Sequence, residues 1–253
     1  MISIEKDAIN KQRFEFNLPF KCIDIMYGNS NEELPKIDWN YKTIIWLDYD
    51  GKISLEILTD IKLVTSKLIS GSVIIVSVNA EPDIYDKDIE ERLDCLKSTL
   101  GKDKVPYDIK ASELSGWGFA KVLRRIINNE IEETLSGRNG GLHDLQKLTY
   151  NQVFNFNYDD GAKMLTVGGV VFDDSQSAHF DQSGFKHIEF IKESDEPYKI
   201  EVPNLTFKEI RRLNEQLPRK TGDILKLPDV PDTDVEKYAK IYRYFPAFSE
   251  TNF

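Results

Sequence analysis

Two carboxylates stand directly after an apolar segment of the chain. Asp48 and Asp50, with Tyr49 between them, follow the nearly continuous apolar run 43–47. Such a run is typical of a strand that is buried on both faces, and functional residues gather in the loops where strands end. A carboxylate there could deprotonate or orient an oxygen or nitrogen group of a substrate. The alternative is a turn built on Asp and Gly.

Shorter strand candidates nearer the N-terminus also end in polar residues. Glu5, followed by Lys6, ends a short β-branched segment, and Asn29 and Ser30 come after the strand candidate 20–26. Ligands bind outside the carboxyl ends of strands in open α/β sheets, so these residues are candidates for binding. The alternative for Glu5 is a solvated acid at a helix start, where it favours the helix dipole.

The sequence offers little for metal or disulfide chemistry. The three histidines are scattered along the chain, and the two cysteines are Cys22 and Cys95. We therefore predict no metal site and no disulfide framework, and we expect a reducing, cytoplasmic compartment. Apolar runs stay well below the roughly 20 residues of a membrane helix, so we expect no membrane partner.

The elements that must position these residues alternate between strand and helix. An amphipathic helix is predicted over 54–69, a strand over 73–78, and further helices over 86–100 and 118–135. Strand, helix and strand in this order favour a parallel sheet with right-handed crossovers. Asn79, at the end of the second strand, is interpreted as a turn-forming residue.

The period of the apolar pattern then changes from that of a helix to that of a strand. The segments 153–158 and 164–172 flank a turn signal and predict an antiparallel hairpin. Gly168 and Gly169, inside the second segment, predict a bulge or a close approach of two backbones.

The last 80 residues have a different character. A small strand pair is predicted over 185–191 and 198–202. The patterns Thr206–Glu209 and Thr233–Glu236 fit capping boxes that open two helices. An aromatic segment follows from residue 238, and its spacing predicts a packing stripe.

The order of these elements resembles the class I S-adenosylmethionine-dependent methyltransferases, over roughly residues 1–172. The fold class implied is α/β, a Rossmann-like and mostly parallel sheet whose C-terminal hairpin places one antiparallel strand inside the sheet. We expect a methyltransferase-like domain over 1–175 and a small α+β extension over 176–253.

The resemblance also implies roles for the polar residues. Glu5, with Lys6 beside it, would contact the ribose hydroxyls of S-adenosylmethionine, and Asn29 and Ser30 would lie at the adenine ring. The segment 48–50 would face the methyl group and the substrate, with Asp48 also near the cofactor and with Tyr49 among the catalytic candidates.

One part of the family pattern has no counterpart before Glu5. The first strand of such folds and its glycine-rich loop hold the methionine portion of the cofactor, and that strand is the central one of the sheet. Three hypotheses follow: the natural protein is longer upstream, another chain supplies the strand, or the sheet has closed up. The resemblance therefore implies cofactor binding that is weakened or absent in the chain as it stands.

Charge narrows the choice of partner. The chain has 33 basic and 43 acidic residues, a net charge of −10, which does not favour a general polyanion binder. A small-molecule or protein acceptor is favoured, while the basic group Lys208, Arg211, Arg212, Arg219 and Lys220 keeps an RNA or DNA acceptor open. An incomplete sheet favours a homo-oligomer or a partner chain.

Two functional hypotheses result. The first is O- or N-methyl transfer from S-adenosylmethionine, or an N-terminally truncated form of such an enzyme, with the acceptor left open. The second is a non-catalytic interaction module built on a degenerate methyltransferase fold, in which the basic helix or the aromatic segment contacts a partner chain.

Overall fold

The computed structural model describes residues 1–82, 88–159, 161–220 and 223–245. The chain divides into two compact units, Met1–Lys199 and Ile200–Phe253. The expected boundary after residue 175 falls inside the first unit, where the helix α6 (Asp174–Gln182) follows a strand directly. Positions 86 and 87 of the predicted helix 86–100, and the aromatic residues beyond 245, lie outside the described residues.

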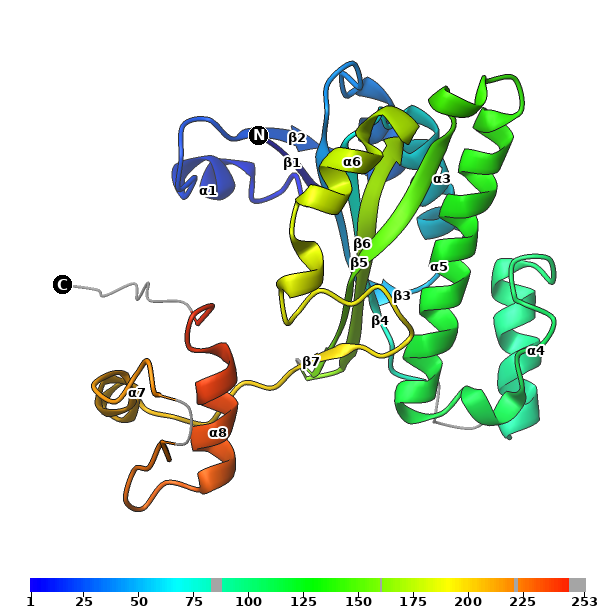
Figure 1. Cartoon of the computed structure of the whole chain (residues 1–253). Coiled ribbons are helices and arrows are strands. Elements are labelled where there is room, and N and C mark those ends of the chain that lie inside the picture. The colour runs from blue at the N-terminus through cyan, green and yellow to red at the C-terminus, as the bar shows by residue number, and fades with distance from the viewer. Residues whose placement is uncertain (83–87, 160, 221–222, 246–253) are drawn as a thin grey trace. The chain divides into compact units, whose positions relative to one another are not determined.

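A mixed five-stranded sheet forms the centre of the first unit (Figure 1). Its strands are β3 (Ile44–Lys52), β4 (Ser72–Asn79), β5 (Leu148–Asp159), β6 (Lys163–Asp173) and β7 (Tyr198–Ile200), in the order β3-β4-β6-β5-β7. β3 and β4 are parallel, and β6 runs antiparallel to both β4 and β5. One antiparallel strand therefore lies inside the sheet, and the predicted α/β class and hairpin are confirmed.

The two adjacent glycines of β6 allow the backbones of neighbouring strands to approach closely at the centre of the sheet. A Cβ on Gly168 would lie 2.5 Å from the carbonyl oxygen of Ile74. The register between β5 and β6 shifts between Gln152 and Phe154, directly opposite the glycines. The predicted bulge and close backbone approach are both present.

Two short strands form a separate sheet. β1 (Ile2–Glu5) and β2 (Asp24–Tyr27) pair in parallel with each other, and neither belongs to the five-stranded sheet. The six-residue helix α1 (Lys11–Phe16) connects them and buries none of its residues. Because β1 does not pair with β3, the hypothesis of a closed-up sheet is wrong for the described residues.

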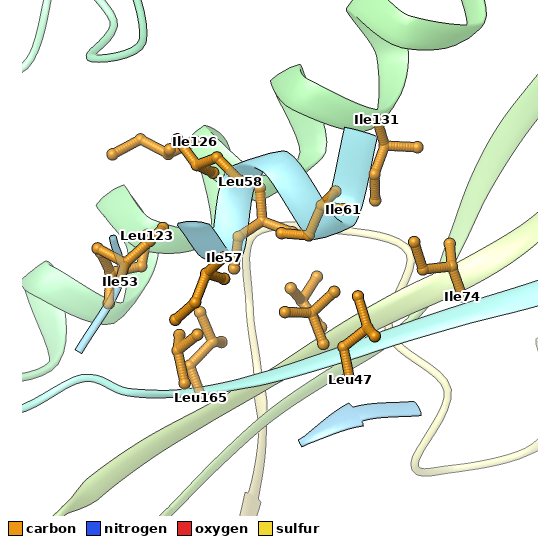
Figure 2. Packing of buried hydrophobic residues seen from close by; sticks show 14 of the residues in the cluster. Leu47, Ile53, Ile57, Leu58, Ile61, Ile74, Leu123, Ile126, Ile131 and Leu165 are labelled. Carbon is orange, nitrogen blue, oxygen red and sulfur yellow. The ribbon is translucent and has the colours of Figure 1, made fainter. Parts of the chain in front are cut away.

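Helices α3 (Leu55–Lys67) and α5 (Gly116–Asn139) cover one face of the five-stranded sheet. The side chain of Ser54 caps α3 by accepting a hydrogen bond from the backbone N–H of Ile57. Figure 2 shows Leu58 and Ile61 of α3 between the α5 residues and the strand residues that they pack against. The largest apolar core of the chain lies here, and it fixes β3 and β4 from this side.

Shorter elements complete the first unit. They are α2 (Ser30–Glu33), α4 (Ile89–Leu100) and the 3-10 turns η1 (Leu34–Lys36), η2 (Ala111–Glu113), η3 (Asp144–Gln146) and η4 (Phe185–His187). The strand predicted over 185–191 is wrong, because Gly184 adopts a left-handed φ of 75° and η4 follows it directly. Phe185 then packs against Phe180 of α6, which stacks on Phe172 of the sheet.

The second unit has a small core of its own. It contains α7 (Phe207–Asn214) and α8 (Asp232–Ile241), with Leu213, Leu225, Val235 and Tyr238 buried together. The capping box of Thr206 and Glu209 is confirmed. The second predicted box is wrong, because Pro231 precedes α8 and Thr233 already lies within the helix. Tyr238 packs edge-on against Phe245, as a packing stripe requires.

Candidate functional site

β3 carries its two carboxylates on the face opposite to the helices. Side chains alternate between the two faces of a strand, and Leu47, between Trp46 and Asp48, is buried under α3. Asp48 and Asp50 therefore point away from the helices, and both are exposed. Neither has a partner among the described residues. Two free carboxylates are thus available to a molecule at this end of the sheet.

The strand does not stop before these carboxylates. β3 runs on to Lys52, which pairs with Asn79 of β4 after a shift of register. The alternative of a turn built on Asp and Gly is therefore wrong. The register shift between Asp48 and Lys52 bends this end of β3 away from regular strand geometry.

A row of hydrogen-bonded side chains crosses the sheet beside Asp48. Ser77 of β4 is in register with Asp48, and its hydroxyl oxygen accepts a hydrogen bond from the indole N–H of Trp46 at 2.8 Å. The hydroxyls of Ser77 and Thr166 are 2.7 Å apart. These polar groups satisfy one another, whereas Asp48 beside them has no partner in the part of the chain that the structure describes.

Tyr49 points to the opposite face and is committed to a buried partner. Its hydroxyl donates to Oδ2 of Asp60 in α3 at 2.7 Å. Burial, and then the hydrogen bond to Asp60, raise the pKa of Tyr49 far above its usual value. The hydroxyl therefore stays protonated, and the geometry gives Tyr49 the role of a donor rather than of a base.

Ser30, which lies on another element, hydrogen-bonds to the same carboxylate of Asp60. It begins α2, directly after β2, and its hydroxyl donates to Oδ2 of Asp60 at 2.5 Å. Its neighbour Asn29 is exposed, and the Asn29 side chain has no partner among the described residues. The two candidates therefore differ: Ser30 is held by the protein, while the amide of Asn29 is free.

Glu5 ends β1, beside the end of β2. Its Oε1 accepts a hydrogen bond from the backbone N–H of Asp7 at 2.9 Å, and its backbone carbonyl accepts one from Gly28. Its second carboxylate oxygen has no partner among the described residues. Lys6 is exposed. Glu5 and Asn29 thus lie at neighbouring strand ends of the two-stranded sheet.

The structure brings some of the predicted residues together and leaves others apart. Ser30 and Tyr49 share Asp60, whereas Glu5 and Asn29 lie at the end of the two-stranded sheet and Asp48 and Asp50 lie in the five-stranded sheet. Sequence reasoning missed Asp60. The sequence does carry a signal for it, because Asp60 lies at helical spacing from buried apolar residues of α3, among them Ile57, Ile61 and Val64.

The end of β4 is occupied by local interactions. Asn79 accepts a hydrogen bond from the backbone N–H of Glu81 at 2.8 Å, which confirms its predicted role in a turn. Both carboxylate oxygens of Glu81 lie 3.1 Å from Nζ of Lys163 at the start of β6. The hydrogen bond from Lys163 lowers the pKa of Glu81.

Over its whole length, residues 1–253, the chain matches the model of a family described as "Putative O-methyltransferase". The chain belongs to this O-methyltransferase family. The methyltransferase assignment predicted from the sequence is thereby confirmed. No curated protein matches the chain.

S-adenosylmethionine is the usual methyl donor of methyltransferases, and its polar groups can be compared with the side chains present in this chain. Its ribose presents two hydroxyl donors, and Glu5 has one carboxylate oxygen without a partner. Its adenine presents donors and acceptors, and the amide of Asn29 can serve both. The donor set therefore fits the adenosine part of the molecule, in keeping with how acidic residues bind ribose in α/β folds.

Other features of the chain do not involve these residues. A hollow of about 470 Å³ is bordered by Asn151, Phe172, Phe180 and Lys186 among others, and by none of the predicted site residues. Within the described ranges, no cluster of three or more His, Cys, Asp or Glu side chains is placed to hold a metal ion. None of the helices in those ranges has the length and apolar character to cross a membrane.

Basic residues of both units are used in ion pairs. Lys121 pairs with Glu196, and Arg125 with Asp108, in the first unit. In the second unit, Arg212 pairs with Glu215 and Arg219 with Glu236. The two pairs of the second unit neutralise part of the basic group Lys208, Arg211, Arg212, Arg219 and Lys220 and weaken the argument for a nucleic-acid partner.

Proposed function

We propose that this chain is an S-adenosylmethionine-dependent O-methyltransferase that acts on the hydroxyl group of a small molecule. The observation that carries the proposal is the pair of exposed carboxylates Asp48 and Asp50 at the carboxyl end of β3, which have no partner among the described residues, in a chain that belongs to an O-methyltransferase family. Their position fits the general rule that ligands of α/β sheets bind outside the carboxyl ends of the strands.

The proposed roles fall to two groups of residues, one at the end of the two-stranded sheet and one at the end of β3. Glu5 would accept hydrogen bonds from the ribose hydroxyls, and Asn29 would hydrogen-bond the adenine ring. Asp48 or Asp50 would hold the acceptor hydroxyl and take its proton as the oxygen forms its bond to the methyl carbon. S-adenosylmethionine, when bound, supplies a methyl group on a positively charged sulfur, whose bond to that carbon breaks with the electron pair going to sulfur.

Orientation accounts for most of the catalysis expected here. The reaction needs the acceptor oxygen in line with the methyl group, and holding two reactants in such a geometry can contribute several kcal/mol. Proton transfer to a positioned carboxylate adds a factor of about 10² to 10⁴. Tyr49, whose hydroxyl is bound to Asp60, would support the backbone of the carboxylates instead of exchanging protons.

The test is turnover with a panel of hydroxylated small molecules. The chain is incubated with S-adenosylmethionine and with phenols, catechols, sugars and hydroxy acids, and the formation of S-adenosylhomocysteine is measured. We expect at least one hydroxyl compound to be methylated, and Asp48→Asn or Asp50→Asn to lower kcat by a factor of about 10² or more.

The matched control is Asp24→Asn. Asp24 is also an exposed aspartate on a strand, but it lies at the opposite end of β2 from Asn29. This variant should keep the full rate. Turnover that is unchanged in both Asp48→Asn and Asp50→Asn would contradict the assignment of these carboxylates, and methyl transfer only to amine acceptors would contradict the O-specific function.

A further inference from the structure

Asp60 is a buried carboxylate that joins three elements. Its side chain lies in α3 and is 2% exposed. Its Oδ2 accepts hydrogen bonds from the hydroxyl of Ser30, at the start of α2, and from the hydroxyl of Tyr49, near the end of β3. Its Oδ1 is buried and has no hydrogen-bond partner.

Such a position is costly for a purely structural residue. A carboxylate loses much of its hydration when it is buried, and two hydroxyl donors on one oxygen return only part of that free energy. The neighbouring buried positions of α3, Ile57, Ile61 and Val64, are apolar. An apolar side chain at position 60 would pack at less cost, so the carboxylate needs a reason beyond packing.

The partners of Asp60 supply that reason, because they come from the two halves of the proposed site. Ser30 follows β2 and neighbours Asn29, on the two-stranded sheet that also carries Glu5. Tyr49 lies between Asp48 and Asp50 on the five-stranded sheet. The two sheets share no strand pairing, so backbone hydrogen bonds do not fix the halves relative to each other.

We propose that Asp60 is a positioning residue that holds the adenosine half and the acceptor half of the site in one geometry. The inference rests on the proposed function. Hydrogen bonds to a carboxylate are directional and about twice as strong as neutral ones, whereas the apolar packing of Ile4 and Leu34 with the main core is non-directional. Asp60 would therefore set the orientation of the two halves, and apolar packing would set their distance.

A positioning role of Asp60 affects the affinity of ligands that contact both halves of the site more than that of ligands that contact one half. Adenosine engages only Glu5 and Asn29, so its affinity should survive the loss of Asp60. S-adenosylmethionine, bound as proposed, would extend from that half toward the carboxylates of β3, so its affinity should depend on how the halves are held. A residue that merely stabilises the fold would affect the two probes alike.

The experiment compares Asp60→Asn with two reference variants by calorimetric titration of adenosine and of S-adenosylmethionine. Asp60→Asn should weaken S-adenosylmethionine binding about tenfold and leave adenosine binding within about threefold, as expected for the loss of hydrogen bonds to a charged group. Glu5→Gln should weaken both probes. Glu56→Gln, an exposed carboxylate on the same helix, should weaken neither.

A second measurement does not depend on any ligand. The backbone N–H groups of Glu32 and Glu33 donate to the carbonyl of Asn29, and their hydrogen exchange reports how firmly the start of α2 is held. In Asp60→Asn, these amides should exchange at least about tenfold faster. Amides in the middle of α5 should keep their rates, which shows that the global fold is intact.

The outcomes separate the inference from the function on which it rests. Unchanged exchange at Glu32 and Glu33, or equal losses for both probes, would overturn the positioning role while the proposed function stands. If the unaltered chain binds neither probe, the proposed cofactor site is wrong and the inference falls with it. Should Asp60→Asn fail to fold, Ser30→Ala removes one donor without touching the buried charge, and it should show the same selective loss with a smaller magnitude.

Discussion

The two sheets of the first unit differ in how much of their surface the protein covers. In the five-stranded sheet, Ile74, Val76 and Val78 of β4 are completely buried. In the two-stranded sheet, neither β1 nor β2 has a buried residue. The helix between β1 and β2 buries none either, and Phe16 at its end is 88% exposed.

Because of this difference, we expect the two halves of the proposed site to differ in rigidity. Asp48 and Asp50 are carried by a strand whose opposite face is fixed by the main core. Glu5 and Asn29 are carried by the two-stranded sheet, which contacts this core through Ile4 of β1, through Leu34 directly after α2, and through the hydrogen bond from Ser30 to Asp60. Regions with few buried contacts open more readily than the core. We therefore expect the acceptor half to be rigid and the adenosine half to depend on its few attachments.

The largest effect expected from this comparison is on stability. Ile61 of α3 is completely buried, and Ile61→Ala should lower the free energy of unfolding by about 2–5 kcal/mol through lost burial and the cavity left behind. Ile2→Ala, in β1, should cost less than about 1 kcal/mol because Ile2 is already 46% exposed. Urea unfolding of both variants measures the two values, and similar losses would contradict the contrast between the sheets.

A second contrast lies within the five-stranded sheet, between its centre and its β3 edge. Gly168→Ala would place a methyl group 2.5 Å from the carbonyl oxygen of Ile74, and neither backbone can move without disturbing the ladder. We expect a loss of about 1–3 kcal/mol.

Gly51 of β3 provides the control for this substitution. A Cβ at Gly51 meets nothing within 4 Å, so Gly51→Ala should be neutral or slightly stabilising. Thermal unfolding of the two variants reports the difference. A neutral Gly168→Ala would show that the centre of the sheet is less tightly packed than its geometry indicates.

Local signals predicted the parts of the fold that depend on neighbouring residues. The hairpin, the bulge opposite Gly168 and Gly169, and the cap at Thr206 each depend on a turn, a missing side chain or a hydrogen bond across three residues. The second cap shows the limit of such signals. Thr233 and Glu236 have the right spacing, but Pro231 sets the start of the helix two residues earlier.

Long-range partners could not be predicted in this way. Asp48 and Asp50 could be named as candidates from the pattern of one strand, whereas the contacts of Asp60 come from Ser30 and Tyr49, which lie on other elements. The orientation of Tyr49 toward the core also depends on which face α3 covers. Strand alternation separates Tyr49 from its neighbours, but only the tertiary structure shows which face is buried.

The smallest expected effect is the pH-dependent contribution to stability of one ion pair beside each of the two sheets. Lys163 lowers the pKa of Glu81 in the folded state. The pair therefore stabilises the fold at pH values above the pKa of Glu81 in the unfolded chain, about 4.3. That stabilisation is lost as the pH falls through the lower, folded value.

Both side chains of this pair are partly exposed, so the contribution should be no more than about 1 kcal/mol. Glu81→Gln should lower stability at pH 7 by that amount and flatten the decline between pH 6 and pH 3. The matched pair beside the two-stranded sheet is Lys11–Glu15 in α1, at 3.7 Å and with both side chains about half exposed. Glu15→Gln should have no measurable effect at either pH. Chemical unfolding across this pH range measures both variants, and an equal loss in Glu15→Gln would show that α1 is held more firmly than its exposure indicates.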